Sequence, residues 1–274
     1  TFGLGMFVTY LQKCKSVEGT LFWFKPESFQ NLLLQLKQEA LLGVFMYLEW
    51  VGYEILLFLG GMLGDLELRS MVICYNFATY VYMPGSGLAN TLTTYVATAM
   101  GEGNRNRIKK AIEASTIISV IYMVLVSSSL ILFSEPIVKI YSSDPPTIEL
   151  TVTLSKIYGC YYMLDQSQIM GVAVLKGSGK EVIGSKYYIF SILGCGMISA
   201  YILGFLFDMK AIGLYWGFAL GLLVMNVLTY RLLRRMDFYE QIRMIKRRIM
   251  ELSTESFKQI EMREMNLLDV EKTY

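Results

Sequence analysis

The chain has 274 residues, of which 54% are hydrophobic, a formal net charge of +2 and no histidine. The lack of histidine argues against zinc, haem and histidine-base enzymes, and the small net charge argues against a nucleic-acid binder. The apolar residues fall in long blocks with the charges between them, as in a chain whose solvent is a lipid bilayer. We therefore predict no enzyme activity, no cofactor, no metal and no nucleic-acid partner.

Two segments precede the first long block. Residues 1–11 are apolar but too short to cross a bilayer, and they lack the basic flank of a signal peptide. We interpret them as the end of a truncated transmembrane helix. Residues 12–38 are predicted to be a polar cytoplasmic connector, whose last part has the apolar spacing of a helix lying in the membrane interface.

Six apolar blocks follow, and each is near or above the roughly 20 residues that a helix needs to cross the hydrocarbon core. The gaps between them are short, which makes consecutive helices antiparallel neighbours. The predicted fold is therefore an all-α integral membrane protein, with a six-helix transmembrane bundle over residues 41–232. The predicted spans are Leu41–Leu63, Ser70–Met100, Ala111–Phe133, Ile148–Leu175, Val182–Phe207 and Ile212–Leu232.

Lysine and arginine are abundant in alternate gaps. The connector, the gap at 101–110, the gap at 176–181 and the tail are rich in them, whereas the remaining gaps hold few. Because basic loops stay on the cytoplasmic side of a membrane, we assign both ends of the chain to the cytoplasm. The membrane itself is left open between the plasma membrane and a vacuolar or endosomal membrane.

Residues 233–274 form a charged tail. Its apolar residues step by four and three, which predicts an amphipathic cytoplasmic helix; they are Phe238, Ile242, Ile245, Ile249 and Leu252. Arg243 and the run 246–248 suit anionic headgroups, and the alternative is a solvated helix without a specific partner.

Three acidic residues lie well inside the predicted spans, namely Glu49, Glu54 and Asp165. An ionisable residue at bilayer depth costs about 2.5–3.5 kcal/mol on insertion scales, so these side chains must face the bundle interior or a wet cavity. We interpret them as residues that carry protons or bind cations. The alternative is that each is a hydrogen-bonded link between helices.

Several neighbours of these acids are candidate cavity residues. Trp50 and Glu54 are four apart and share a helix face, and a tryptophan beside a carboxylate suits a cation. Gln168 lies three residues after Asp165, on the same face. Asn76 and Tyr82 are the candidates on the second span, although polar residues there also serve helix packing.

The second span also contains Pro84, Gly85 and Gly87. A proline inside a helix frees a backbone carbonyl and permits a bend. Such a bend is either a hinge used in alternating access or a static kink.

A series of short elements resembles, in order, the multidrug and toxic compound extrusion (MATE) family. The first is Leu48-Glu49-Trp50 with Tyr53-Glu54, which is similar to the LEWW...E stretch of eukaryotic members. The others are Leu59-Gly60-Gly61, Tyr82-Met83-Pro84 through Gly87, Ala99 through Asn104, Asp165 with Gln168, Leu175 through Gly179, and Gly213 through Gly217.

The resemblance implies one lobe of the MATE transporter fold, the C-terminal one, which would face a missing N-terminal six-helix lobe across a central cavity. It implies a secondary active antiporter that exports organic compounds, cations in particular, or xenobiotics in exchange for protons or sodium. Glu49, Glu54 and Asp165 match acidic positions that the family ties to cation coupling and export.

Some positions depart from the family pattern. Val51 stands in place of a second tryptophan, Asn76 where animal members often have glutamate, and Tyr95, Thr98 and Tyr188 where arginine or asparagine is common. Two other functions stay open: a lipid or lipid-linked flippase of the same superfamily, which a basic cavity would favour, and a non-transporting lobe or scaffold fragment.

Overall fold

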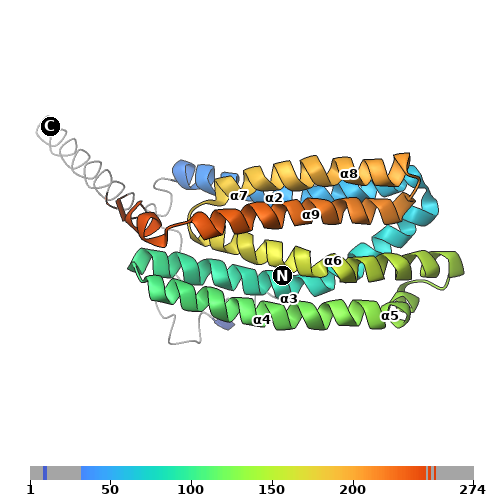
Figure 1. Ribbon diagram of the computed structural model, residues 1–274, viewed down its shortest axis with the longest axis horizontal. Coiled ribbons are helices and arrows are strands. Elements are labelled where there is room, and N and C mark those ends of the chain that lie inside the picture. The colour runs from blue at the N-terminus through green and yellow to red at the C-terminus, as the bar shows by residue number, and fades with distance from the viewer. Residues whose placement is uncertain (1–8, 11–31, 245, 248–249, 251–274) are drawn as a thin grey trace, which may run out of the picture. The chain divides into compact units, whose positions relative to one another are not determined.

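The computed structural model describes residues 9–10, 32–244, 246–247 and 250, and all regular structure in these residues is helical (Figure 1). The chain divides into two compact units, Thr1–Tyr47 and Leu48–Tyr274. Helix α2 (Leu32–Leu63) begins in the first unit and ends in the second. All packing discussed below lies within the second unit. The predicted segments 1–11 and 12–38 fall mostly outside the described residues.

Each of the six predicted blocks is helical. After α2 come α3 (Asp65–Glu102), α4 (Arg105–Leu132) and the short α5 (Ser134–Tyr141), then α6 (Pro145–Gly177). The fifth block is one continuous helical stretch with two π-helical parts: α7 (Glu181–Tyr188), η3 (Ile189–Gly196), α8 (Met197–Tyr201) and η4 (Ile202–Leu206). The last is α9 (Lys210–Arg235).

Local sequence sets the ends of these helices. Gly103 ends α3 in the left-handed conformation, with φ 75°, which glycine adopts without a steric penalty. The Asn104 side chain then accepts a hydrogen bond from the Arg107 N–H at 3.1 Å and caps α4. Asp144 caps α6 in the same way at Thr147, directly before two prolines that fit the first helical turn.

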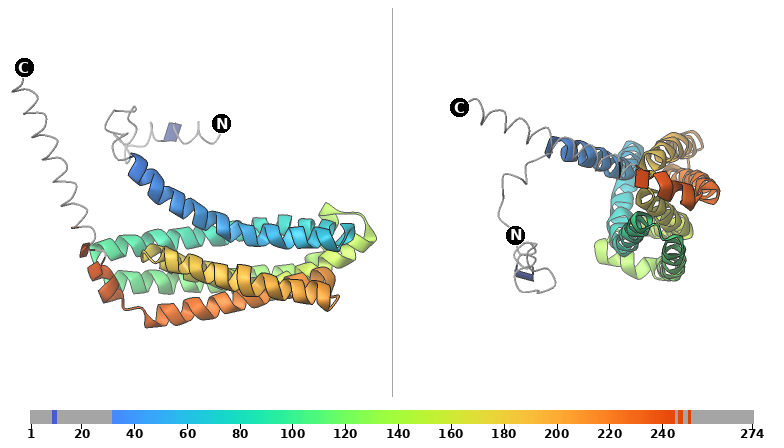
Figure 2. Two further views of the ribbon diagram at one scale, coloured as in Figure 1. Left: turned by 90° about the horizontal axis from the view of Figure 1, so that it is seen from above. Right: turned by 90° about the vertical axis from the view of Figure 1, so that its left-hand side faces the viewer.

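Helix α6 is the centre of the second unit. It packs against α3 and α4 on one side and against α9 on the other (Figures 1 and 2). Its buried positions include polar side chains at several levels: Thr151, Ser155, Asp165, Gln166 and Gln168. The polar residues that lower the hydropathy of this block are therefore turned towards neighbouring helices.

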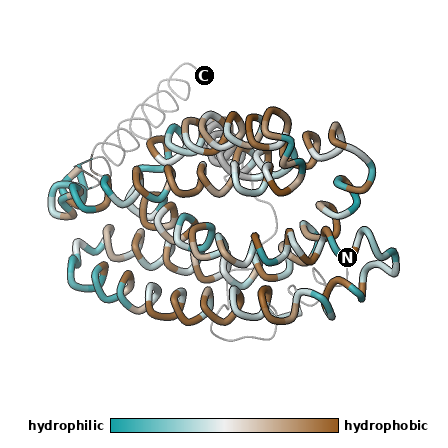
Figure 3. Tube along the Cα trace, turned by 45° about the vertical axis from the view of Figure 1, so that its right-hand side comes forward, coloured by the Kyte–Doolittle hydropathy of each residue, from teal (hydrophilic) through white to brown (hydrophobic). Residues whose placement is uncertain are grey.

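Three helical stretches among the described residues are long and apolar enough to cross a membrane: Arg105–Leu132, Glu181–Leu206 and Lys210–Arg235. A shorter apolar stretch covers Trp50–Leu63. Apolar residues dominate the middle of the helices and hydrophilic ones gather towards their ends (Figure 3). All six blocks are thus helical, and three of them meet this hydropathy criterion, so the crossing count of six stays a prediction.

The start of the tail packs on the bundle. Met236 and Ile242 are buried in one apolar cluster with Val96 and Ile108, and Phe238 packs against that cluster. The Arg105 guanidinium lies 4.6 Å from the centre of the Tyr239 ring. The first apolar positions of the predicted amphipathic helix therefore contact protein, while Ile245, Ile249 and Leu252 lie outside the described residues.

Glycines bring α9 against the fifth block at backbone contact. Gly213, Gly217 and Gly221 recur every four residues on α9, opposite Gly196, Ala200 and Gly204. A Cβ on Gly221 would lie 2.7 Å from the Gly196 Cα, and a Cβ on Gly217 would overlap the backbone of Ala200. Inside a bilayer the hydrophobic effect does not drive helices together. Helices there pack instead through small residues, which let their backbones approach closely.

We expect Gly217→Ala to destabilise the chain, because the added methyl group must push α9 away from a backbone rather than from a flexible side chain. Overpacking costs about 1–3 kcal/mol, so the thermal unfolding midpoint in detergent should fall by roughly 5 °C. Gly101→Ala is the matched control, since nothing lies within 4 Å of its added Cβ. Equal midpoints for the two variants would show that this seam is not tightly packed.

Candidate functional site

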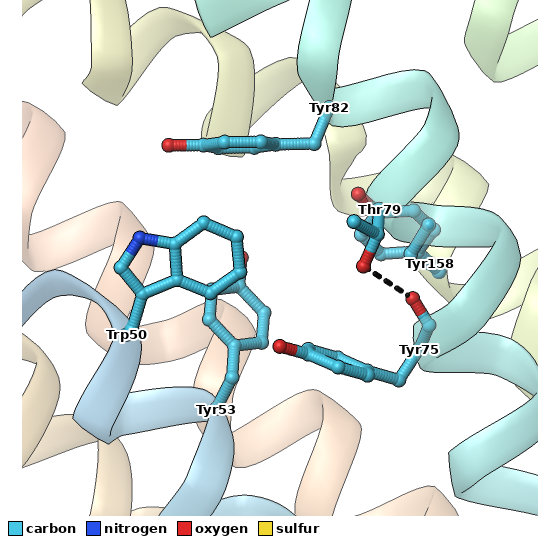
Figure 4. Close-up of a pocket in the computed structure, with 7 residues that line it drawn as sticks. Trp50, Tyr53, Tyr75, Thr79, Tyr82 and Tyr158 are labelled. Atoms are coloured by element: carbon cyan, nitrogen blue, oxygen red, sulfur yellow. Dashed lines mark hydrogen bonds between the residues drawn. The ribbon is translucent and has the colours of Figure 1, made fainter. Parts of the chain in front are cut away.

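A pocket opens between α2, α3 and α6, and its walls are mostly aromatic (Figure 4). Its cavity volume is about 40 Å³. Helix α2 contributes Trp50 and Tyr53, α6 contributes Tyr158, and the residues from α3 are Tyr75, Ala78, Thr79 and Tyr82.

Helical periodicity brings these side chains to a common wall. The residues from α3 lie at positions i, i+3, i+4 and i+7, and the two from α2 are three apart. The Trp50 and Tyr82 rings meet edge to face at 5.6 Å across the pocket. Tyr53 packs behind them, with its ring centre 4.8 Å from that of Phe218 on α9.

Asp165 on α6 lies next to this pocket and is only 3% exposed. The Tyr53 hydroxyl donates a hydrogen bond of 3.1 Å to its Oδ1 atom. The Tyr158 hydroxyl also lies beside the carboxylate, but no hydrogen bond reaches Oδ2. Among the ion pairs of the described residues, none involves Asp165. The carboxylate is thus held by the Tyr53 phenol, and no cationic side chain in the described part of the chain forms an ion pair with it.

The structure describes the two predicted acids on α2 less completely than it describes Asp165. Glu54 is exposed, and its charge acts on Tyr75, which lines the pocket. It therefore lies near the rim of the pocket rather than in its wall. Glu49 is on α2, but its side chain lies outside the described residues.

The predicted cavity residues fall into three groups. Trp50 and Tyr82 line the pocket. Asn76 is exposed, and its amide donates to the Val72 carbonyl of its own helix at 2.9 Å. Gln168 is buried on α6 and does not line the pocket. The structure brings Trp50, Tyr82 and Asp165 together and leaves Asn76 and Gln168 apart from them.

Pro84 lies inside α3, and a network of side chains surrounds the backbone just before it. The Val81 carbonyl accepts hydrogen bonds from the hydroxyls of Tyr122 at 2.6 Å and Tyr162 at 3.1 Å. Gly85 is buried against the Gln166 side chain, whose Oε1 would overlap any Cβ at this position. Gly87 has open space around it. The bend region is therefore tied to α4 and α6 by tyrosines.

Tyrosines are the functional residues that sequence reasoning missed. Tyr53, Tyr75 and Tyr158 line the pocket, and Tyr122 and Tyr162 hold the backbone before Pro84. A signal was present, because Tyr158, Tyr161, Tyr162 and Asp165 have the spacing of one helix face. For metals, no group of three or more Cys, Asp or Glu lies together within the described part of this chain.

Comparison with known proteins identifies relatives of this arrangement. The chain is 29% identical over 163 residues to human "Multidrug and toxin extrusion protein 1". That alignment covers 57% of this chain and 29% of the human protein. The chain is also 25% identical over 227 residues to Arabidopsis thaliana "Protein DETOXIFICATION 12". That alignment covers 82% of this chain and 47% of the Arabidopsis protein.

Among solved structures, the eukaryotic MATE transporter AtDTX14 superposes with a TM-score of 0.81 at 20% identity. That match covers 90% of this chain and 56% of AtDTX14. This chain therefore spans about half or less of the length of these proteins, and its fold is that of a MATE transporter segment. The family model that matches residues 42–202, more than half of the 274-residue chain, is that of MatE, and the chain belongs to the MatE family.

Proposed function

We propose that this chain is one lobe of a secondary active antiporter that exports organic cations in exchange for protons or sodium. The observation that supports it most is the state of Asp165: a buried carboxylate with one unpartnered oxygen, beside an aromatic pocket, and without a cationic side chain among the ion pairs of the described residues. The names of the relatives, which refer to extrusion and detoxification, agree with export.

The physical reason is the cost of an unpaired charge in a low dielectric. A buried carboxylate must be neutralised by a proton or by a cation that comes from outside the chain. If both neutralise the same group, binding of one releases the other. Such mutual exclusion is the elementary step of an exchange transporter.

The pocket favours an organic cation as the exported species. Trp50, Tyr75 and Tyr82 present aromatic surfaces, which attract cations through the ring quadrupole. The pocket lining contains no lysine or arginine, and a lipid-linked anion would need such a charge. No observation on this pocket therefore favours the flippase alternative.

Glu54 is the proposed second carboxylate. It is exposed near Tyr75, so it can meet a cation before that cation reaches Asp165. Glu49, Asn76 and Gln168 are retained as proposed members of the wider cavity that a second lobe would complete, since Asn76 and Gln168 do not line the aromatic pocket itself. Asn76 and Glu54 are both exposed, which suits residues that face a second lobe.

The proposed setting is a membrane crossed six times, with both ends of the chain on the cytoplasmic side and an N-terminal lobe completing the cavity. The six helical blocks and the basic turns at one end of the bundle support this. The bend at Pro84, Gly85 and Gly87 is proposed to act as the hinge during alternating access, since α3 forms much of the pocket wall.

Transport should fail when the buried carboxylate is lost. In proteoliposomes of the full gene product, Asp165→Asn and Glu54→Gln should each lower proton-driven exchange of tetraethylammonium more than tenfold, because one exchange partner loses its site. Glu149→Gln, at an exposed acid near the start of α6, should stay within about twofold. Exchange that survives both site variants contradicts the proposal.

The Tyr53–Asp165 bond should appear as an energetic coupling. Tyr53→Phe leaves the buried Oδ1 without its donor and should cost about 1–3 kcal/mol of stability. In the Asp165→Asn background the same change should cost less, so a double-mutant cycle on thermal unfolding should give a clear coupling energy. Tyr75→Phe is the control, as its hydroxyl makes no hydrogen bond with Asp165. Simple additivity of the two changes would show that the bond is absent.

The six crossings place the α3–α4 turn and the α5–α6 turn on opposite sides. We expect a cysteine at Asn104 to react with a membrane-impermeant maleimide from the cytoplasmic side, and a cysteine at Ser143 from the other side. Both positions are exposed, and the native cysteines would first be replaced by serine. Labelling of both from one side would contradict the predicted topology.

A further inference from the structure

A second and larger cavity lies on a different side of α6 from the aromatic pocket. It is a groove between α4, α6 and α9 with a cavity volume of about 440 Å³. The groove exists because α4 and α9 each pack on α6 rather than on one another. None of the seven residues of the aromatic pocket lines it.

The long walls of the groove are apolar. Val120 and Met123 on α4 face Met170 and Val174 on α6, and Leu233 on α9 completes the wall. A chain of methylene groups could lie along such a surface and bury about 0.8 kcal/mol per CH₂ at most. The groove therefore suits an acyl chain.

The helices that wall the groove also carry exposed apolar residues. On α4, Ile117 is 62% and Ile121 is 57% exposed, and on α9, Leu223 and Val227 are 46% and 40% exposed. In the proposed membrane setting, side chains of this kind face hydrocarbon. The helices that wall the groove would therefore be in contact with the acyl chains of the bilayer.

One end of the groove carries a positive charge. Arg234 lines it, with its guanidinium 4.4 Å from the centre of the Tyr230 ring, which also lines it. This end belongs to the basic end of the bundle, where the exposed lysines and arginines of three helix termini gather; they are Arg107, Lys109, Lys110, Arg231, Arg235 and Arg243. An anionic group is therefore favoured at this end and at no other point of the groove lining.

Polar groups stand between the charge and the apolar walls. Thr229, which lines the groove, is 3% exposed, and its hydroxyl has no hydrogen-bond partner. It lies five residues before Arg234, which is about 7 Å along the helix axis. The succession of a cation, a hydroxyl and then an apolar channel matches a phosphate, a glycerol ester and an acyl chain.

We infer that this groove binds one anionic glycerophospholipid, with its phosphate at Arg234 and an acyl chain along the walls formed by α4, α6 and α9. The site is separate from the proposed transport cavity. The bound lipid would hold α4 and α9 in register across a gap that no described side chain fills. The inference does not require that the chain transports anything.

Native mass spectrometry of the purified chain, titrated with phosphatidylglycerol or phosphatidylcholine, tests the charge. The unmodified chain should bind phosphatidylglycerol more tightly. Arg234→Gln should weaken that binding about fivefold, as one interfacial cation contributes about that factor, and should leave phosphatidylcholine unchanged. Arg235→Gln is the matched control, because this neighbouring exposed arginine does not line the groove. Equal losses of phosphatidylglycerol affinity in both variants would show that general surface charge causes the preference. That result would overturn the inference.

A second pair of variants tests the acyl chain. Val120→Trp fills the groove and should abolish lipid adducts, whereas Val124→Trp, at a similarly exposed position one turn along α4 and outside the groove lining, should leave them intact. Equal adducts in the two variants would contradict the inference. Glycerol 3-phosphate at millimolar concentration should not displace the lipid, and displacement would mean that only an anion site is present. The thermal unfolding midpoints of all four variants identify any variant that fails to fold. If Val120→Trp fails to fold, the comparison of Arg234→Gln with Arg235→Gln still tests the inference.

Discussion

A carboxylate buried on the central helix is the constraint around which this bundle is organised. Asp165 cannot be left in an apolar core without hydrogen bonds, and the group that meets it, the Tyr53 hydroxyl, comes from a helix more than one hundred residues earlier in the chain. That bond ties α2 to α6 at the level of the aromatic pocket. Because it satisfies only one oxygen, the same contact that stabilises the fold leaves a polar atom ready for a ligand.

Tyrosine hydroxyls carry out a second structural task at the bend of α3. Two of them, from Tyr122 and Tyr162, donate to the Val81 carbonyl close to Pro84. The carbonyl that loses its helical donor to Pro84 is that of Tyr80, four residues earlier, so these two bonds hold the residue next to it. The bend is thus connected directly to α4 and α6, and α6 also carries the carboxylate. The proposed coupling carboxylate and the proposed hinge are therefore both in contact with α6.

Helix α6 also separates two cavities of different chemistry. On one side are aromatic rings and a carboxylate without basic residues, and on another is an apolar groove with Arg234 at its end. The two proposed ligands, a cation and an anionic lipid, would therefore bind to different faces of α6. The close glycine seam between α9 and the fifth block fixes one wall of the groove, since α9 can approach α8 but leaves a gap towards α4.

The sequence by itself determined the helices and the family. Hydropathy and the charged gaps located all six blocks to within six residues at each end, apart from α2, which begins nine residues before its predicted start. Among the cavity candidates from the sequence, Trp50 and Tyr82 line the aromatic pocket, and Asp165 lies next to it. Only the tertiary structure decided that Tyr53 rather than Gln168 serves the carboxylate, that Asn76 turns back to its own helix, and that α4 and α9 leave a groove between them. These facts depend on how far each helix is rotated about its axis, and that rotation is set by glycine contacts and ring packing between segments far apart in the chain.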